Sequence, residues 1–183
     1  MKKNKISFET NFWYAYDIEN PFEVIDAFFD YADLDHYKQR LAEAVLYISK
    51  QEVYKKEYPG QVFVFYTTLR SFLKACFYLQ NKGKKWKVKQ ASDCKSILHR
   101  ASLTKEEYAN PFTVFQIAFT EKSLDEFDFF LCEIIHISLS PNVEEFDYDL
   151  ITPYIHLVKM LDASQIMRES GLEKIKKNIL PLE

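Results

Sequence analysis

Apolar side chains recur three and four residues apart over much of the chain, the spacing that places them on one face of an α-helix. The stretch 34–48 follows this rhythm, and a more apolar stretch at 124–137 repeats it. The apolar positions of the first stretch are Leu34, Tyr37, Leu41, Val45 and Ile48. These patterns predict two amphipathic helices, each preceded by a shorter helix at 21–30 or 111–120.

Residues that start helices stand just before these stretches. Asn-Pro occurs at 20–21 and again at 110–111. Asn accepts hydrogen bonds from the free N–H groups of a first turn, and Pro has no N–H to leave unsatisfied there. Asp33 and Ser123 precede the two longer stretches and are of the same capping type. We therefore predict helix starts at all four places.

The stretch 61–79 permits two interpretations. Its aromatic and branched residues at 62–66 could form a strand in isolation. A later segment with similar residues carries Tyr154, Leu157 and Leu161 at helical spacing. We therefore predict helices in both places.

One sequence pattern occurs twice. Asn-Pro-Phe-x-Val at 20–24 returns at 110–114, and nine of the 29 positions from 20 to 48 are identical to those 90 residues later. Average composition gives about two such identities. After a two-residue deletion the match continues at an offset of 88 residues, with the identical pairs Tyr66/Tyr154, Leu69/Leu157, Leu73/Leu161, Ala75/Ala163 and Gly83/Gly171. The two glycines follow predicted helices and suit the left-handed C′ position.

These observations predict an all-α fold of two tandem three-helix pseudo-repeats. Because a unit of about 70 residues buries little apolar surface alone, we expect the copies to pack as one helical bundle domain with approximate internal twofold symmetry. This single domain, 1–183, divides into an aromatic N-terminal arm at 1–19, repeat 1 at 20–90, a basic helical insert at 91–109 and repeat 2 at 110–178.

The two segments outside the repeat have weaker patterns. The arm could be a strand or a packed segment, and its aromatic run at 12–16 could be a recognition surface. We favour burial against the bundle, because large exposed apolar patches are rare on monomers. In the insert we expect a helix around Ser92–Ala101 and a further turn opened by Thr104.

Composition agrees with a folded helical chain. Of the 183 residues, 48% are hydrophobic and three are glycine, too few for many tight hairpins. Cys76, Cys94 and Cys132 form no C-x-x-C pair, so neither a disulfide framework nor a zinc site is indicated. No signal peptide is recognised, and no apolar run approaches the roughly 18 residues that a membrane helix needs. We expect a cytoplasmic protein with no membrane partner.

Positive charge is concentrated in one stretch of a chain whose net charge is −3. From Lys82 to Lys105, eight basic side chains stand against Asp93 alone, a local balance of +7. A partner with phosphates would gain affinity by releasing counterions from these groups, and Trp86 could stack on an unpaired base. The candidate polyanion-binding residues are Lys82, Lys84, Lys85, Trp86, Lys87, Lys89, Lys95 and Arg100.

The basic run also has a plainer interpretation. Lysines after a helix complement the negative end of its dipole, and such runs are common on solvated surfaces. We favour this interpretation over a nucleic-acid site. A weaker basic run at 174–177 follows the second copy, and twofold symmetry would place both runs at related positions.

Glu43 and Glu133 occupy equivalent positions among apolar residues, where a carboxylate is costly unless it is paired. Glu133-x-x-His136 has the spacing of helical di-iron and di-manganese centres, and Glu43 could complete such a site from the other copy. However, Leu46 stands where a second histidine is needed. We therefore favour a structural role for both carboxylates and predict no metal site.

No catalytic set is visible. Cys132 and His136 lie one turn apart on one predicted helix and cannot by themselves build an oriented triad, so Cys132 is interpreted as a small core residue. The chain has no Gly-x-Gly-x-x-Gly and no Gly-Lys-Ser/Thr loop. We predict no catalytic residue and no cofactor, and we favour a protein that is not an enzyme.

The leading functional hypothesis is a non-enzymatic intracellular helical interaction or scaffold protein, whose partner is another protein or a second copy of the chain. A nucleic-acid-binding regulator that uses residues 82–105 is the alternative. A carboxylate-bridged metal protein centred on Glu43, Glu133 and His136 is the third hypothesis.

Overall fold

The computed structural model describes residues 7–50, 58–89, 102–139 and 149–175. The described chain is mostly helical, so the predicted all-α class is confirmed. The helices are α1 Pro21–Tyr31, α2 Leu34–Lys50, α3 Pro59–Leu79, α5 Lys105–Ala109, α6 Phe112–Glu121, α7 Leu124–Leu139 and α8 Ile151–Ser170. Shorter elements are the 3-10 turns Thr10–Phe12 and Lys82–Lys84 and the strands β1 Trp86–Val88 and β2 Leu172–Lys174. The helix expected at Ser92–Ala101 lies outside the described residues.

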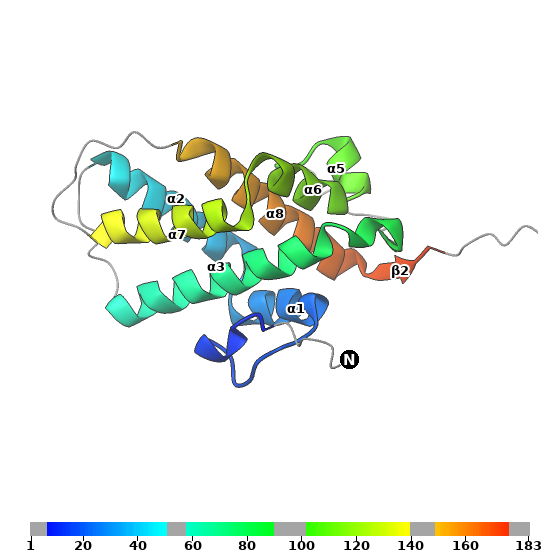
Figure 1. Ribbon diagram of the computed structural model, residues 1–183, viewed down its shortest axis with the longest axis horizontal. Coiled ribbons are helices and arrows are strands. Elements are labelled where there is room, and N and C mark those ends of the chain that lie inside the picture. Colours follow the sequence, from blue (N-terminus) through cyan, green and yellow to red (C-terminus); the bar gives the residue numbers. More distant parts are fainter. Residues whose placement is uncertain (1–6, 51–57, 90–101, 140–148, 176–183) are drawn as a thin grey trace, which may run out of the picture.

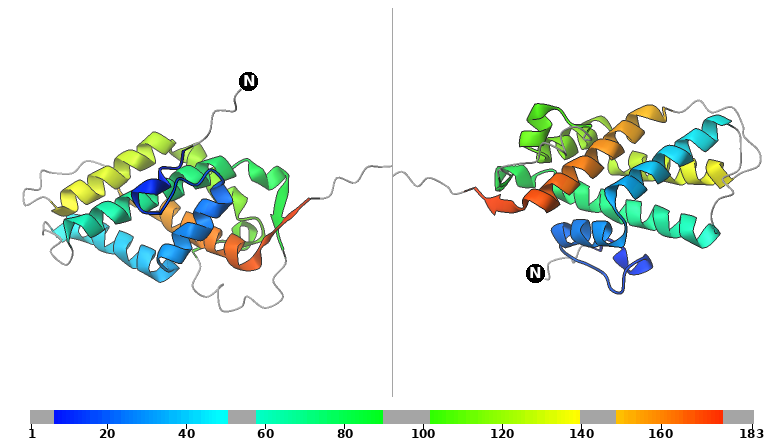
Figure 2. Two further views of the ribbon diagram at one scale, coloured as in Figure 1. Left: turned by 90° about the horizontal axis from the view of Figure 1, so that it is seen from below. Right: turned by 180° about the vertical axis from the view of Figure 1, so that it is seen from behind.

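The helix α3 runs through the middle of the molecule (Figure 1). It packs on α1 and the N-terminal arm, and also on α7 and α6, while α8 packs on α6, α2 and α1. The helices α2 and α7 lie side by side. Strands β1 and β2 pair at one end of the bundle, and the C-terminal ends of α2 and α7 lie at the opposite end (Figure 1 and Figure 2). The long helices therefore share one apolar core.

Stacked aromatic rings form part of this core. The centre of the Phe28 ring lies 3.8 Å from the centre of the Tyr37 ring and 4.6 Å from that of the Phe72 ring. None of the three is more than 1% exposed. Because the Tyr37 hydroxyl donates to the Phe28 carbonyl at 2.9 Å, its burial leaves the polar atom satisfied. Burying a large apolar side chain of this kind stabilises the fold by about 2 kcal/mol.

Three of the four predicted helix starts are confirmed. Asn20 accepts a hydrogen bond at 3.1 Å from the N–H of Phe22, and Pro21 is the first residue of α1. Asp33 accepts at 2.7 Å and Ser123 at 3.2 Å from N–H groups in the first turns of α2 and α7. These caps satisfy N–H groups that have no partner within the helix, which is why the helix starts are visible in the sequence.

The fourth prediction, that Asn110 caps the helix at 111–120, is wrong. Asn110 ends α5, and its carbonyl accepts from the N–H and the hydroxyl of Thr113 at 3.0 and 2.7 Å. Pro111 takes the position before α6, which begins at Phe112. The reason is that α5 occupies the chain directly before α6, whereas an extended residue precedes α1. Thr104 opens α5 with a complete capping box, as predicted.

The two repeated glycines serve different purposes. Gly171 ends α8 with a φ of 71°, as expected of a glycine there, although its ψ of 167° is extended rather than helical. Gly83 lies in a 3-10 turn without a positive φ, so the C′ prediction is wrong for it. A Cβ at Gly83 would lie 2.9 Å from the Cβ of Phe112. Close packing against α6 therefore excludes a side chain at Gly83.

The N-terminal arm packs along α3 and forms no strand among its described residues, 7–19. Phe8 is fully buried. The Glu9 carboxylate accepts from the Arg70 guanidinium at 2.9 Å, and the Trp13 indole N–H donates to the Ser71 hydroxyl at 2.9 Å. These contacts fix the arm against α3 at several points along its length.

The ambiguous stretch 61–79 is helical throughout. By length and composition this helix is apolar enough to cross a membrane, so the expectation that no run approaches this limit is wrong. Within the structure, 61% of the apolar window found in Gly60–Lys84 is buried. A helix at the centre of a folded core meets the same criterion, because it is covered on most sides by apolar neighbours.

Candidate functional site

The predicted basic segment forms part of a two-stranded antiparallel ribbon, here termed the basic ribbon and comprising residues 82–89 and 171–175. The paired residues are Trp86 with Lys174, Lys87 with Glu173 and Val88 with Leu172. Two backbone hydrogen bonds of 2.9 and 3.1 Å continue the ladder beyond the strands. The pairing brings the strong basic run beside the start of the weak one.

The lysines of the basic ribbon lie at the surface. Exposed lysines of the first strand and its approach are Lys82, Lys84, Lys85, Lys87 and Lys89. Lys87 forms an ion pair with Glu173 at 3.0 Å. The remaining predicted residues, Lys95 and Arg100, lie outside the described residues. The described part of the predicted polyanion site is therefore a group of exposed ammonium ions around Trp86.

Trp86 is not an open platform for a base. It is half-buried, and its ring lies 5.6 Å from that of Phe22. The Lys174 ammonium lies 5.4 Å from the centre of the indole, a distance at which a cation is attracted to the ring. A stacked base would compete with these contacts. The predicted stacking role of Trp86 therefore gains no support from its surroundings.

A second candidate site, the aromatic surface, is formed where the arm meets α1 and α3. Its members are Phe12, Tyr14, Tyr16, Tyr31 and Phe63. Their exposed fractions range from 37% for Tyr14 to 62% for Tyr16, so the expected burial of the run at 12–16 is wrong for most of it. The ring centres of Tyr14 and Tyr16 lie 5.2 Å apart, and those of Phe12 and Phe63 lie 6.5 Å apart. Half-buried Trp13 contacts Tyr14 and Tyr31.

Buried residues on either side hold the aromatic surface in place. Thr10 closes the loop, because its hydroxyl donates to the Tyr16 carbonyl at 2.9 Å and accepts from the Ile18 N–H at 2.7 Å. Ile18 is 4% exposed. The neighbouring Tyr16 raises the pKa of Tyr14, so the Tyr14 phenol keeps its proton at neutral pH. The loop that carries Tyr14 and Tyr16 is thus held in one conformation by contacts within the protein.

The residues of the metal hypothesis do not form a metal-binding group. Across the part of the chain that the structure describes, no three His, Cys, Asp or Glu side chains are placed to hold one ion. Glu43 accepts a hydrogen bond from the Gln39 amide at 2.9 Å, one helical turn away. Glu133 is half-buried and His136 is exposed. Local pairing therefore accounts for Glu43 without a metal.

Cys132 is exposed, so its interpretation as a core residue is wrong. The helix α7 turns Leu131 and Ile134 into the core and leaves Cys132 on its outer side. Its sulfur lies 2.9 Å from the Tyr66 hydroxyl oxygen. Burial, followed by the neighbouring thiol, raises the pKa of Tyr66, so this phenol is no general base at neutral pH.

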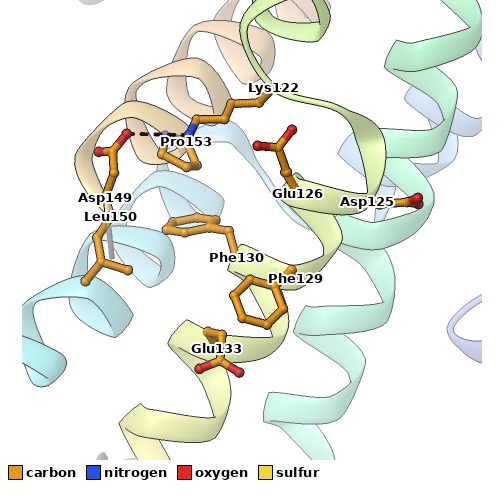
Figure 3. A pocket seen from close by; sticks show the side chains of 9 residues that line it. All are labelled: Lys122, Asp125, Glu126, Phe129, Phe130, Glu133, Asp149, Leu150 and Pro153. Carbon is orange, nitrogen blue, oxygen red and sulfur yellow. Dashed lines mark ion pairs between the residues drawn. The ribbon is translucent and has the colours of Figure 1, made fainter. Parts of the chain in front are cut away.

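A cleft of about 400 Å³, here termed the acidic cleft, lies between α7 and the start of α8 (Figure 3). It is lined by Lys122, Asp125, Glu126, Phe129, Phe130, Glu133, Asp149, Leu150 and Pro153. Along α7, Phe129 and Phe130 lie between Glu126 and Glu133. Leu150 and Pro153 face them from the start of α8. The cleft therefore has an apolar middle with a carboxylate at each end of its α7 wall.

Two carboxylates of the acidic cleft are fixed by caps. Asp149 accepts from the Thr152 N–H at 3.0 Å and lies 3.7 Å from the Lys122 ammonium. Glu126 forms a capping box with Ser123. Backbone hydrogen bonds lower the pKa of Glu126 and of Asp149, so both are anions at neutral pH. The cleft thus holds a negative potential.

A second cleft of about 390 Å³ lies in the first half of the chain. It is lined by Tyr31, Ala32, Asp33, His36, Tyr37, Arg40, Gln61, Val64, Phe65 and Thr68. In the repeat alignment, His36 and Arg40 are the equivalents of Glu126 and Phe130. The Arg40 guanidinium lies 5.5 Å from the centre of the Phe65 ring. The two clefts therefore resemble each other in position but carry different charges.

Comparisons of the chain with protein-family models, with curated proteins and with solved structures find no match. The candidate sites therefore depend on geometry alone. Sequence reasoning missed the acidic cleft, although a signal was present. Glu126, Phe130 and Glu133 follow each other at four and three residues, which places acidic and aromatic side chains on one face of α7.

Proposed function

We propose that the protein is a non-enzymatic interaction protein that docks a protein partner on the aromatic surface. The observation that carries this proposal is the cluster of Phe12, Tyr14, Tyr16, Tyr31 and Phe63, with exposed fractions between 37% and 62%. Exposed apolar clusters of this kind mark interaction sites on folded proteins, and aromatic residues contribute most of the binding free energy at such sites.

The contacts that fix the aromatic surface support the interpretation that its exposed rings bind a partner. Phe8 and Ile18, on either side of the loop, are buried, and Trp13 is tied to Ser71 of α3. Residues already held in place lose little conformational entropy on binding. Tyr side chains add a hydroxyl that forms hydrogen bonds at the edge of an apolar contact. The surface thus combines the properties of a protein-binding site.

Immunoprecipitation with mass spectrometry tests this proposal. A Tyr14→Ser plus Tyr16→Ser variant should lose the recovered partner, whereas Ile117→Ser, which changes a 44% exposed residue of α6, should retain it. Sedimentation equilibrium identifies a second copy of the chain as the partner, since only the double variant would then be monomeric. Recovery of no partner under several growth conditions, together with a monomeric wild type, would count against the proposal.

The proposed architecture is two pseudo-repeats, 20–90 and 110–178, packed about an internal twofold axis within one domain. Two contacts between equivalent residues support it. Cys76 Sγ lies 3.8 Å from Ser164 Oγ, and Trp86 pairs with Lys174. Each pair is 88 residues apart, the offset of the sequence repeat. A residue meets its own equivalent only close to a twofold axis.

The helix contacts also occur in matched pairs. The contact of α3 with α7 has a counterpart in that of α8 with α2, and the contact of α3 with α6 has one in that of α8 with α1. Likewise α1 packs on α3 as α6 packs on α8, and α2 packs on its own counterpart α7. Such pairing is expected when two copies of one unit bury their apolar faces against each other.

The proposed site of action is the cytoplasm. Cys76 and Cys132 are both free thiols, which is typical of proteins in reducing compartments. Cell fractionation tests this assignment, and recovery of the protein with secreted material would contradict it.

A second candidate function is polyanion binding by the basic ribbon. The specific observation in its favour is the pairing of β1 with β2, which adds Lys174 to the exposed lysines at 82–89. A gel shift with DNA and RNA at low and high salt tests it. Lys84→Glu plus Lys87→Glu should abolish retardation, and Ile155→Glu, which adds a negative charge at an exposed position of α8 outside the ribbon, should not. Absence of retardation at low salt would remove this candidate.

A further inference from the structure

The acidic cleft combines an apolar wall with negative charge. Phe129, Phe130 and Leu150 provide the apolar side chains, and Phe129 is 50% exposed. Four carboxylates line the cleft against one ammonium group, and that ammonium, Lys122, lies 3.7 Å from Asp149. An anionic ligand would be repelled there, and a purely apolar one would leave the negative charge of Glu133 unneutralised.

Glu133 is the carboxylate that points most directly to a ligand. It is half-buried at one end of the row on α7, beside Phe129 (Figure 3). No described residue donates a hydrogen bond to its side chain or forms an ion pair with it. Glu126, at the other end of the row, is occupied by the Ser123 cap. A cation bound near Glu133 would therefore satisfy a carboxylate that the protein leaves open.

We propose that the acidic cleft binds an amphipathic organic cation, a protonated amine attached to an aromatic or branched apolar body. The ammonium group lies against Glu133, and the apolar body lies on Phe129 and Phe130. A volume of about 400 Å³ is within the range of small-molecule sites. Attraction between the charges sets the orientation, and burial of the apolar body supplies most of the affinity.

The second cleft provides an internal contrast. Where the acidic cleft has Glu126 and Phe130, the second cleft has His36 and Arg40. The second cleft also has one carboxylate, Asp33, but Arg40 is a permanent cation, which opposes binding of an amine. A ligand selected by charge should therefore bind more tightly at the acidic cleft than at the second one. A ligand held only by apolar contacts would not discriminate between them.

The test uses the full-length protein and two ring-matched probes, 1-naphthylmethylamine, which is a cation at neutral pH, and 1-naphthaleneacetate, which is an anion. Amide chemical shifts locate binding, and calorimetry measures affinity. We expect the amine to shift residues of 122–133 and 149–153 and the acetate to leave them unchanged. Glu133→Gln should weaken amine binding about fivefold, the effect of one partly solvated charge contact. Its equivalent Glu43→Gln, outside the cleft lining, should bind like the wild type.

Three results would overturn the proposal. The first is equal binding of amine and acetate, and the second is an amine affinity unchanged in Glu133→Gln. The third is no amine binding while a lysine-rich peptide shifts the same residues, which would make the cleft a protein-docking site. Circular dichroism of Glu133→Gln separates loss of binding from loss of folding.

Discussion

The sulfur of Cys76 lies 3.8 Å from the hydroxyl oxygen of Ser164, at the place where α3 and α8 meet deep in the core. Both residues are fully buried. They also occupy the same position in the two copies of the sequence repeat, 88 residues apart. The contact therefore joins a residue to its own counterpart and indicates where the proposed twofold axis passes through the core.

The two described cysteines should differ in reactivity. Burial raises the pKa of the Cys76 thiol, whereas Cys132 is exposed. Because only the thiolate is nucleophilic, iodoacetamide at neutral pH should modify Cys132 in the folded protein and Cys76 only after unfolding. Peptide mapping by mass spectrometry measures both sites in one sample. Equal rates at the two sites in the folded state would contradict the placement of α7.

Alanine at two glycines should change stability in opposite directions. Gly83→Ala should destabilise by about 2 kcal/mol, because the new Cβ would lie 2.9 Å from the Phe112 Cβ and overpack the core. Gly60→Ala, in the first turn of α3, has no atom within 4 Å of its new Cβ. It should stabilise by about 0.5 kcal/mol through the unfolded chain. Urea unfolding measures both, and a stabilising Gly83→Ala would refute the close approach.

Glu107 should make stability depend on acid pH. Burial opposes its ionisation, but hydrogen bonds from Lys159 and Thr104 outweigh this effect and lower the pKa of Glu107. A pKa that is lower in the folded state stabilises the protein above the unfolded value of about 4.5. That stability is lost as the pH falls through the folded pKa.

The variant Glu107→Gln tests this linkage. At pH 7 it should lose about 2 kcal/mol, the typical effect of removing a charged hydrogen-bond partner. The difference from the wild type should shrink as the pH falls below about 4.5, because protonation removes the same charge. Exposed Glu106→Gln in the same turn is the control and should show a smaller difference. A difference for Glu107→Gln that stays constant with pH would show that its charge is unimportant.

The sequence predicted those parts of the fold that depend on local interactions. Asp33 and Ser123 allowed the starts of α2 and α7 to be predicted, because a helix cap needs only a short polar side chain within the same turn. The prediction that Asn110 caps α6 was wrong because α5 ends directly before α6 and changes the backbone conformation at Asn110. The capping propensity of a single residue does not show the presence of such a neighbouring helix. The class and most helix boundaries were therefore predictable.

The candidate sites were less predictable because they depend on contacts distant in sequence. A pair of three-residue strands carries no periodic signal, so the ribbon of Trp86 and Lys174 was not expected as a β-structure. Cys132 was assigned to the core because a free cysteine usually behaves as a small apolar residue, and only the packing of α7 in the folded chain shows that it faces outward. The exposed fraction of Tyr16 depends equally on how the arm folds back on α3.

Engineered disulfides across β1 and β2 test the central architectural claim most directly. Val88 and Leu172 are paired between hydrogen-bonded positions of the ladder, where the Cα atoms are close enough for a disulfide. With Cys94 and Cys132 replaced by serine, oxidation of Val88→Cys plus Leu172→Cys should give a nearly complete cross-link. The shifted control, Val88→Cys plus Glu173→Cys, should give little. Equal cross-linking of both, or of the shifted pair alone, would break the register that pairs Trp86 with Lys174 and would contradict the proposed axis.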